Sequence, residues 1–331
     1  MTAEPKAEGL VPLAAIQEAA RLLDGVAVAT PLVSSRELAE ELGFPVALKL
    51  ESLQRTGSFK FRGAFNFLSQ LTSQELEKGV ITYSSGNHAQ AVALAARLKG
   101  VPAVVVMPTT APQVKVEGAR RLGARVVMEG TTSEERRGKA EAIAGDEGLT
   151  MVPPFDHAHI IAGQGTVGLE ILAADPSVRT ILVCVGGGGL LSGVAAAVKG
   201  LDPTVQVMGV EPEGAASMSA ALDAGRPVTL PSISTIADGL APVRVGGLTF
   251  RHARDLVDGV VTVDDESIRQ AAAFLFHRHK LVVEFSGAAA LAALRSGAVG
   301  PVKGPVAAVV TGGNLDPSLL SQLDHAPPHP L

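Results

Sequence analysis

The stretch TILVCVGGGGL at residues 180–190 decides the fold class. Its first six residues are mostly apolar and β-branched, which is typical of a strand buried in a parallel sheet. Four glycines follow, and residues 190–199 then have the composition of a helix. The stretch therefore predicts a strand, a glycine turn and a helix, which is the repeating unit of an α/β fold.

The glycine turn predicts a phosphate site. Without β-carbons at Gly186, Gly187, Gly188 and Gly189, successive backbone N–H groups can point at one anion beside a helix N-terminus. A plain strand-to-helix turn needs only one or two glycines. We therefore interpret this turn as a cradle for a phosphate group.

The same alternation continues in both directions along the chain. Further strands are expected at residues 46–50, 80–83, 103–107, 125–128, 205–210 and 306–310, and helices at 89–99, 133–144 and 267–278. The prediction is an α/β protein with mostly parallel sheets, whose ligands bind at the carboxyl ends of the strands. With 331 residues, two domains around one cleft are expected rather than a single core.

Composition excludes several classes of protein. Apolar residues make up 47% of the chain, charged residues 18%, and the net charge is −5, so nucleic acid is not an expected partner. The single Cys184 is expected to be a buried strand thiol, which suits a reducing compartment. No apolar run reaches the ~20 residues of a membrane span, and the N-terminal residues carry no secretory signal. These features predict a cytoplasmic enzyme that does not bind membranes.

Two polar segments follow predicted strands. The segment GSFKFRGA at 57–64 places Lys60 between two phenylalanines, and partial desolvation would lower the pKa of its amine and make it a nucleophile. The segment SSGNHAQ at 84–90 offers hydroxyl and N–H groups at a helix start, where they could hold a carboxylate. In isolation, a solvated lysine and a plain helix cap explain the two segments as well.

A third glycine motif, GQGTVG at 163–168, fits the spacing of a dinucleotide-binding loop. No strand clearly leads into it, and no acidic residue follows at the distance that a ribose would need. We therefore do not expect NAD to bind there.

Taken together, these motifs resemble the serine/threonine dehydratase branch of the fold-type-II pyridoxal-phosphate enzymes, which also contains serine racemase. The resemblance extends from about residue 27 to residue 316. It depends on six segments in the same order: GSFKFRGA at 57–64, SSGNHAQ at 84–90, IAGQGT at 161–166, GGGGL at 186–190, IADG at 236–239 and TGGN at 311–314.

The resemblance implies a role for each segment. Lys60 would bind pyridoxal 5'-phosphate as a Schiff base and act in catalysis together with Ser85. The other implied cofactor contacts are Phe59, Asn87, Gly186, Gly187, Gly188, Gly189, Leu190, Gly239, Glu284 and Thr311. The substrate would meet Ser84, Ser85, Gly86, Asn87, His88 and Ala89. Thr311 would face the pyridine nitrogen with a neutral hydroxyl, which favours elimination over transamination.

The implied fold has two three-layer α/β/α domains with mostly parallel sheets. Residues 1–69 and 157–331 would form a large cofactor-binding domain, and residues 70–156 a small mobile domain that closes over the substrate. The implied reaction removes water from a β-hydroxy amino acid, either L-threonine or L-serine, and yields a 2-oxo acid and ammonia. A homodimer is implied by the resemblance alone.

Two positions depart from the family pattern. Glu211 and the Ala215 carbonyl match a divalent-cation site, for Mg²⁺ or Ca²⁺, but Ser217 stands where an acidic ligand is usual, and hard cations want several charged oxygens. Phe285 replaces a usual proline and is expected to reshape the wall beside the substrate.

Alternatives remain open at this stage. A serine or amino-acid racemase would share every cofactor contact, and Ser85 matches the acid/base residue of serine racemase. A dehydratase acting on 3-hydroxyaspartate or phenylserine is a further alternative. A ligand-sensing α/β protein would explain the glycine turns but not Lys60.

Overall fold

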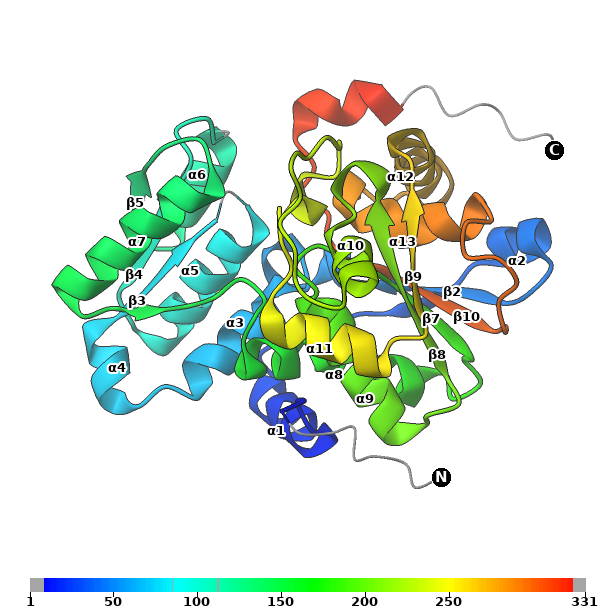
Figure 1. Cartoon of the computed structure of the whole chain (residues 1–331), viewed down its shortest axis with the longest axis horizontal. Coiled ribbons are helices and arrows are strands. Elements are labelled where there is room, and N and C mark those ends of the chain that lie inside the picture. Colours follow the sequence, from blue (N-terminus) through cyan, green and yellow to red (C-terminus); the bar gives the residue numbers. More distant parts are fainter. Residues whose placement is uncertain (1–8, 85, 112, 324–331) are drawn as a thin grey trace.

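Two sheets of unequal size organise the protein (Figure 1). The computed structural model describes residues 9–84, 86–111 and 113–323. The larger sheet has the strand order β1 (Leu32–Ser34), β2 (Val46–Leu50), β10 (Val306–Val310), β7 (Thr180–Cys184), β8 (Gln206–Pro212) and β9 (Gly259–Val263). The smaller has the order β5 (Arg125–Met128), β4 (Ala103–Met107), β3 (Val80–Tyr83) and β6 (Thr150–Met151). All neighbouring strands are parallel except β1 and β2.

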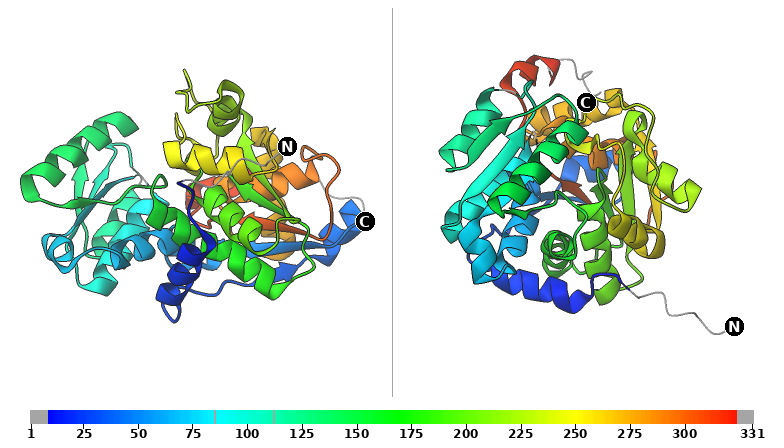
Figure 2. Two further views of the ribbon diagram at one scale, coloured as in Figure 1. Left: turned by 60° about the horizontal axis from the view of Figure 1, so that its bottom comes forward. Right: turned by 60° about the vertical axis from the view of Figure 1, so that its left-hand side comes forward.

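Helices surround both sheets (Figure 2). Those of the smaller sheet are α4 (Ser73–Lys78), α5 (Asn87–Lys99), α6 (Gln113–Arg121) and α7 (Ser133–Glu147). The rest are α1 (Leu13–Leu23), α2 (Arg36–Leu42), α3 (Lys60–Ser69), α8 (Ala158–Ala174), α9 (Gly189–Leu201), α10 (Ser217–Ala224), α11 (Gly247–Leu256), α12 (Asp265–His279) and α13 (Phe285–Arg295). Short 3₁₀ turns are η1 (Glu51–Leu53), η2 (Arg55–Gly57), η3 (Glu213–Ala215), η4 (Asp238–Leu240) and η5 (Pro317–Leu323). No helix in the described part of the chain could span a membrane.

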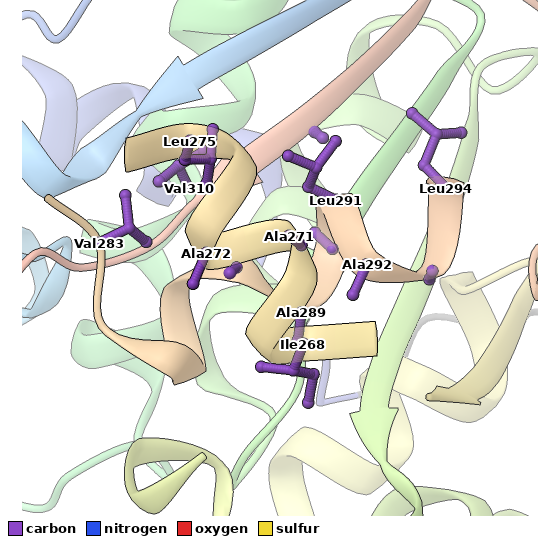
Figure 3. Close-up of a cluster of buried hydrophobic side chains, with 14 of the residues drawn as sticks. Ile268, Ala271, Ala272, Leu275, Val283, Ala289, Leu291, Ala292, Leu294 and Val310 are labelled. Atoms are coloured by element: carbon purple, nitrogen blue, oxygen red, sulfur yellow. The ribbon is translucent and has the colours of Figure 1, made fainter. Parts of the chain in front are cut away.

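The central strand β7 shows why the larger sheet is a middle layer. Its alternate residues Ile181 and Val183 are buried against α9 and α11, whereas Leu182 and Cys184 are buried against α12 and α13. The two sides of this strand therefore belong to two different apolar clusters, as expected for a parallel strand covered on both faces. Figure 3 shows the second cluster, in which Ile268 of α12 and Leu291 of α13 contribute apolar side chains.

The smaller sheet is also covered on both faces. Val105 of β4 belongs to an apolar cluster with residues of α5 and α6, while Val104 and Val106 pack with Ala140 of α7. The α/β class and the parallel sheets that the sequence predicts are confirmed. Cys184 is buried as expected, and burial raises the pKa of its thiol to about 11.

The GQGTVG motif lies inside α8, which begins at Ala158. Its glycines permit close helix packing. A β-carbon on Gly163 would lie 2.6 Å from the Arg62 carbonyl oxygen of α3, and one on Gly165 would lie 2.8 Å from the Gly193 carbonyl oxygen of α9. The motif is therefore a helix-packing feature, and the rejection of a dinucleotide loop stands.

Candidate active site

The carboxyl ends of β2, β10 and β7 bring three of the predicted turns together. These strands are neighbours and run parallel, so the segments that follow them meet at one edge of the larger sheet. An isolated bridge pairs Ser58 with Gly312, and the Phe59 N–H donates to the Thr311 carbonyl oxygen at 3.2 Å. The lysine segment and the TGGN turn are thus joined directly.

Lys60 is the first residue of α3, and its amine points into protein rather than into solvent. Nζ donates to the Pro154 carbonyl oxygen at 2.9 Å and lies 5.2 Å from the centre of the Phe59 ring. Burial lowers the pKa of the Lys60 amine to about 8, and the Glu284 carboxylate opposes that shift. An appreciable fraction of the amine is therefore neutral near pH 7, as a nucleophile or base requires.

A buried ion network holds the start of α3. The Arg62 guanidinium binds both oxygens of Glu51, each at 2.8 Å, and also contacts Glu170 of α8. Arg62 and Glu51 are almost wholly buried. Because Lys60 lies two residues before Arg62, this network fixes the backbone from which the lysine side chain extends.

The glycine turn lies at the N-terminus of α9, next to β7. Gly188 has φ +92°, and no side chain caps the helix. A β-carbon on Gly187 would lie 2.2 Å from the Phe155 ring, and one on Gly186 would lie 3.0 Å from the Gly239 carbonyl oxygen. Among the described residues, Gly187, Gly188 and Gly189 donate no backbone hydrogen bond. Uncapped N–H groups at a helix start suit a phosphate.

Leu190 and Thr249 hold this turn in place, the first by apolar packing and the second by a hydrogen bond. Leu190 is buried in the apolar cluster of α9, and Thr249 Oγ1 donates to the Gly187 carbonyl oxygen at 2.7 Å. Leu190 can therefore reach a ligand with its backbone only.

Asn87 lies at the first residue of α5, and its amide is held from two sides. Its Nδ2 donates to Glu284 Oε1 at 2.6 Å, and its Oδ1 accepts from Asn314 Nδ2 at 2.8 Å.

Glu284 is buried, which raises the pKa of its carboxyl group to about 7. Asp238 adds to this shift, while Asn87, Lys115 and Lys60 oppose it. A β-carbon on Gly312 would lie 2.1 Å from Glu284 Oε1, so the TGGN turn needs glycine there.

The segment that the resemblance assigns to the substrate begins where β3 ends. Ser84 Oγ accepts from the Gly86 N–H at 3.3 Å, and Ala89 is buried. His88 is buried with Nε2 3.2 Å from the Val152 carbonyl oxygen; burial and the charge of Lys60 lower its pKa to about 3. His88 is therefore a neutral structural donor. Ser85, predicted as a catalytic residue, lies outside the described residues.

Gly239 and Thr311 are placed by Ser286 of α13. The Gly239 N–H donates to Ser286 Oγ at 2.8 Å, and Thr311 Oγ1 donates to the Ser286 carbonyl oxygen at 3.5 Å. Thr311 is buried, with a neutral hydroxyl as predicted.

An ion pair connects the two halves of the site. Lys115 Nζ of α6, beside the smaller sheet, lies 3.2 Å from Asp238 Oδ2 of η4, beside the larger one. A β-carbon on Gly86 would lie 3.7 Å from the same Nζ, which places this amine next to the substrate segment.

Several of these groups have no marker in the sequence. The Pro154 carbonyl and the Phe155 ring come from the chain that returns from the smaller sheet, and nothing in their residue types indicates a site. Asn314, Asp238 and Lys115 can be recognised as site residues only from their contacts with other segments. The only sequence signal for Asn314 is its place in the TGGN turn.

The Glu211 carboxylate, predicted as a cation ligand, is hydrogen-bonded within the protein. Glu211 is fully buried, and its two oxygens accept from the Met218 N–H at 2.6 Å, the Ser219 N–H at 2.9 Å and the Ser219 hydroxyl at 2.8 Å. Ala215 is buried nearby. The described residues contain no group of three acidic, histidine or cysteine side chains that could hold a metal. The Glu211 carboxylate accepts these hydrogen bonds from the start of α10, and the cation site stays a prediction.

Phe285 does not line the substrate segment. It is the first residue of α13 and is buried in the apolar cluster between α12 and the larger sheet, so the expectation that it reshapes the substrate wall was wrong.

Comparison with known proteins finds relatives that match most of the chain. A family model described as pyridoxal-phosphate dependent enzyme matches residues 24–312. An L-threonine ammonia-lyase of Thermotoga maritima is 44% identical over 315 residues, covering 95% of this chain and 78% of that protein. An L-threo-3-hydroxyaspartate ammonia-lyase of Pseudomonas is 42% identical over 299 residues, covering 90% and 94%. The structure of maize serine racemase superposes with a TM-score of 0.89 at 38% identity, covering 94% and 96%.

Proposed function

The chain belongs to the pyridoxal-phosphate dependent enzyme family, and from this premise we propose that it is an ammonia-lyase acting on a β-hydroxy amino acid, with L-threonine or L-serine as substrate. The observation that carries the proposal is the partly neutral amine of Lys60 at the carboxyl edge of the larger sheet, beside the glycine turn. Relatives over most of the chain length are named for this activity.

The residues present fit the cofactor. The N–H groups of the glycine turn would bind the phosphate, Lys60 the aldehyde carbon, Asn87 the ring oxygen and Thr311 the ring nitrogen. Phe59, Gly239 and Glu284 would complete the contacts. When bound, pyridoxal phosphate stabilises the electron pair that remains after the Cα–H bond of an attached amino acid breaks.

Each residue then has a limited task. The N–H and hydroxyl groups at Ser84, Gly86 and Ala89, together with Ser85, would hold the substrate carboxylate. The Lys60 amine would take the proton from Cα, since burial keeps its pKa within reach of neutral pH. The β-hydroxyl leaves as water, and the released enamine reacts with water to give ammonia and a 2-oxo acid, which is 2-oxobutyrate from threonine and pyruvate from serine.

The neutral hydroxyl of Thr311 favours this reaction over transamination. A carboxylate at that position would hold a proton on the ring nitrogen and make the cofactor a stronger electron acceptor. Thr311 offers only a buried hydroxyl. Elimination of a β-leaving group needs less stabilisation of the Cα electron pair.

We further propose that residues 70–156 form the mobile domain, which closes by rigid-body movement toward the larger unit of residues 1–69 and 157–331. The Lys115–Asp238 ion pair would hold the closed form. A homodimer and a cytoplasmic location belong to the same proposal and follow from family likeness and from the single buried cysteine.

A substrate panel tests the function. L-Threonine, L-serine, L-threo-3-hydroxyaspartate and phenylserine are incubated with cofactor-loaded protein, and 2-oxo acid, ammonia and D-enantiomer are measured together, with Lys60→Ala as control. Fast 2-oxo acid release from threonine or serine, absent in the variant, supports the proposal. Release from hydroxyaspartate alone would move the activity to that substrate, as in the Pseudomonas relative. A D-amino acid without 2-oxo acid would make the protein a racemase, as in the structural neighbour.

A further inference from the structure

A chain of side-chain hydrogen bonds joins four separate segments behind the candidate cofactor site. Asn314 Nδ2 donates to the Thr56 carbonyl oxygen at 2.7 Å and to Asn87 Oδ1 at 2.8 Å. Asn87 Nδ2 in turn donates to Glu284 Oε1 at 2.6 Å. The chain therefore begins at a backbone carbonyl in the segment before Lys60 and ends at a buried carboxyl group.

The order of donors and acceptors in this chain follows from its first member. A backbone carbonyl can only accept, so the amide nitrogen of Asn314, not its oxygen, must face Thr56. The same nitrogen also faces Asn87, which must then present its oxygen. Consequently the nitrogen of Asn87 is turned toward Glu284. An asparagine amide can rotate by half a turn with almost no change in shape, so such neighbours decide its direction.

The Thr56 carbonyl, which decides the direction of the Asn314 amide, is itself held in place by the surrounding backbone. Thr56 has φ 60° and Gly57 has φ 75°, two successive left-handed residues that define the direction of the segment. The Gly313 N–H donates to the Gly57 carbonyl oxygen at 2.8 Å, which ties the segment to the TGGN turn. A β-carbon on Gly57 would lie 2.5 Å from Asn314 Oδ1, so the Asn314 amide packs directly on this backbone.

We propose that Asn314 is a positioning residue: through its amide, the Thr56 carbonyl fixes the direction in which Asn87 presents its N–H donor to the ring oxygen of pyridoxal phosphate. This inference rests on the proposed function, because it requires that cofactor beside Asn87. Asn87 Nδ2 carries two hydrogens, of which Glu284 takes one. If the Asn87 amide were reversed, its oxygen would face both the ionised Glu284 carboxylate and the ring oxygen, and both contacts would become repulsive.

Asn314→Asp tests the inference because it keeps the shape of the side chain and removes the donor. The new carboxylate would face two acceptors, the Thr56 carbonyl and Asn87 Oδ1, and the Asn87 amide would reverse. The readouts are the dissociation constant of pyridoxal phosphate and the visible absorption maximum of the bound cofactor. We expect cofactor binding about tenfold weaker or more, since a hydrogen bond to a charged acceptor is lost, together with a shifted absorption maximum. Asn314→Ala, which adds no charge, is expected to change both readouts in the same direction by a smaller amount.

A double-mutant cycle separates positioning from a local structural effect. In an Asn87→Ala background there is no amide to orient, so Asn314→Asp should cause little further loss of affinity and no further spectral shift. Equal losses in both backgrounds would overturn the inference. The melting temperature of each cofactor-free variant shows that it is folded, and Asn314→Ala replaces Asn314→Asp in the cycle if the latter is not. A wild-type protein that binds no pyridoxal phosphate would instead refute the proposed function itself.

Discussion

Gly188 and Thr249 are so close that a β-carbon on Gly188 would lie 2.9 Å from Cβ of Thr249. The backbone of Gly188 also has φ +92°, a value that residues other than glycine rarely adopt. Both the backbone conformation and the neighbouring side chain therefore require glycine at position 188.

Gly188→Ala should distort this turn and weaken pyridoxal-phosphate binding. Holding alanine at this φ costs about 1–3 kcal/mol, which the loop can relieve by moving its N–H groups away from the phosphate. We expect at least a tenfold higher dissociation constant for the cofactor, measured by absorption titration. Gly145→Ala in α7 is the matched control, because nothing lies within 4 Å of its β-carbon, and it should leave cofactor binding unchanged. Equal binding by both variants would contradict a phosphate site at the turn.

Glu284→Gln should change how the stability of the cofactor-free protein depends on pH. Burial raises the pKa of Glu284 from 4.5 to about 7. The folded protein therefore binds a proton that the unfolded chain has already released, and the stability contributed by this proton is lost as the pH rises through that window. Glutamine does not titrate. We expect the melting temperature of the variant, relative to wild type, to rise between pH 4.5 and pH 7. A difference that is constant with pH, or that falls, would be inconsistent with a buried Glu284.

Asp238→Asn should impair closure of the site. The ion pair with Lys115 is partly exposed, because the Asp238 side chain is 65% accessible, so its strength is at most about 1 kcal/mol. We expect KM for the amino acid to rise by up to about fivefold at low salt, and the difference from wild type to shrink at high salt. Glu147→Gln removes an ion pair with Arg125 within the smaller unit and should not change KM. The same KM for all three proteins would show that the Lys115 contact has no part in closure.

Chelation should not affect the wild-type enzyme. Glu211 is already satisfied by the start of α10, and Ser217 supplies no charge. We expect the same activity and melting temperature with EDTA, Mg²⁺ or Ca²⁺. Ser217→Asp should lower the melting temperature without metal, because it adds a second buried carboxylate, and Ca²⁺ should restore it. Stabilisation of the wild type by either cation would refute this reading.

Five expected strands match the structure residue for residue: 46–50, 80–83, 103–107, 125–128 and 306–310. Four of them are mostly apolar and almost wholly buried, whereas 125–128 is partly exposed. The strands β1 and β6 were not predicted, since they have only three and two residues and carry no pattern. The strand β9 was also missed, although GVVTV has the composition of a strand.

The site could be predicted only where residue type carries the chemistry. A lysine between aromatic residues and four consecutive glycines are recognisable by themselves. The Pro154 carbonyl that accepts from Lys60 is not, because any residue offers a carbonyl and only the fold brings it there. The same is true of the Thr56 carbonyl, whose effect on Asn87 depends on three segments meeting.

Chemical trapping shows whether Lys60 binds the cofactor. The cofactor-loaded protein is reduced with borohydride, and its peptides are identified by mass spectrometry. We predict a phosphopyridoxyl group on the peptide that contains Lys60, and no comparable label on that peptide when the reductant is added to cofactor-free protein. Stoichiometric labelling of a different lysine, or no label on any lysine of a protein saturated with pyridoxal phosphate, would contradict it.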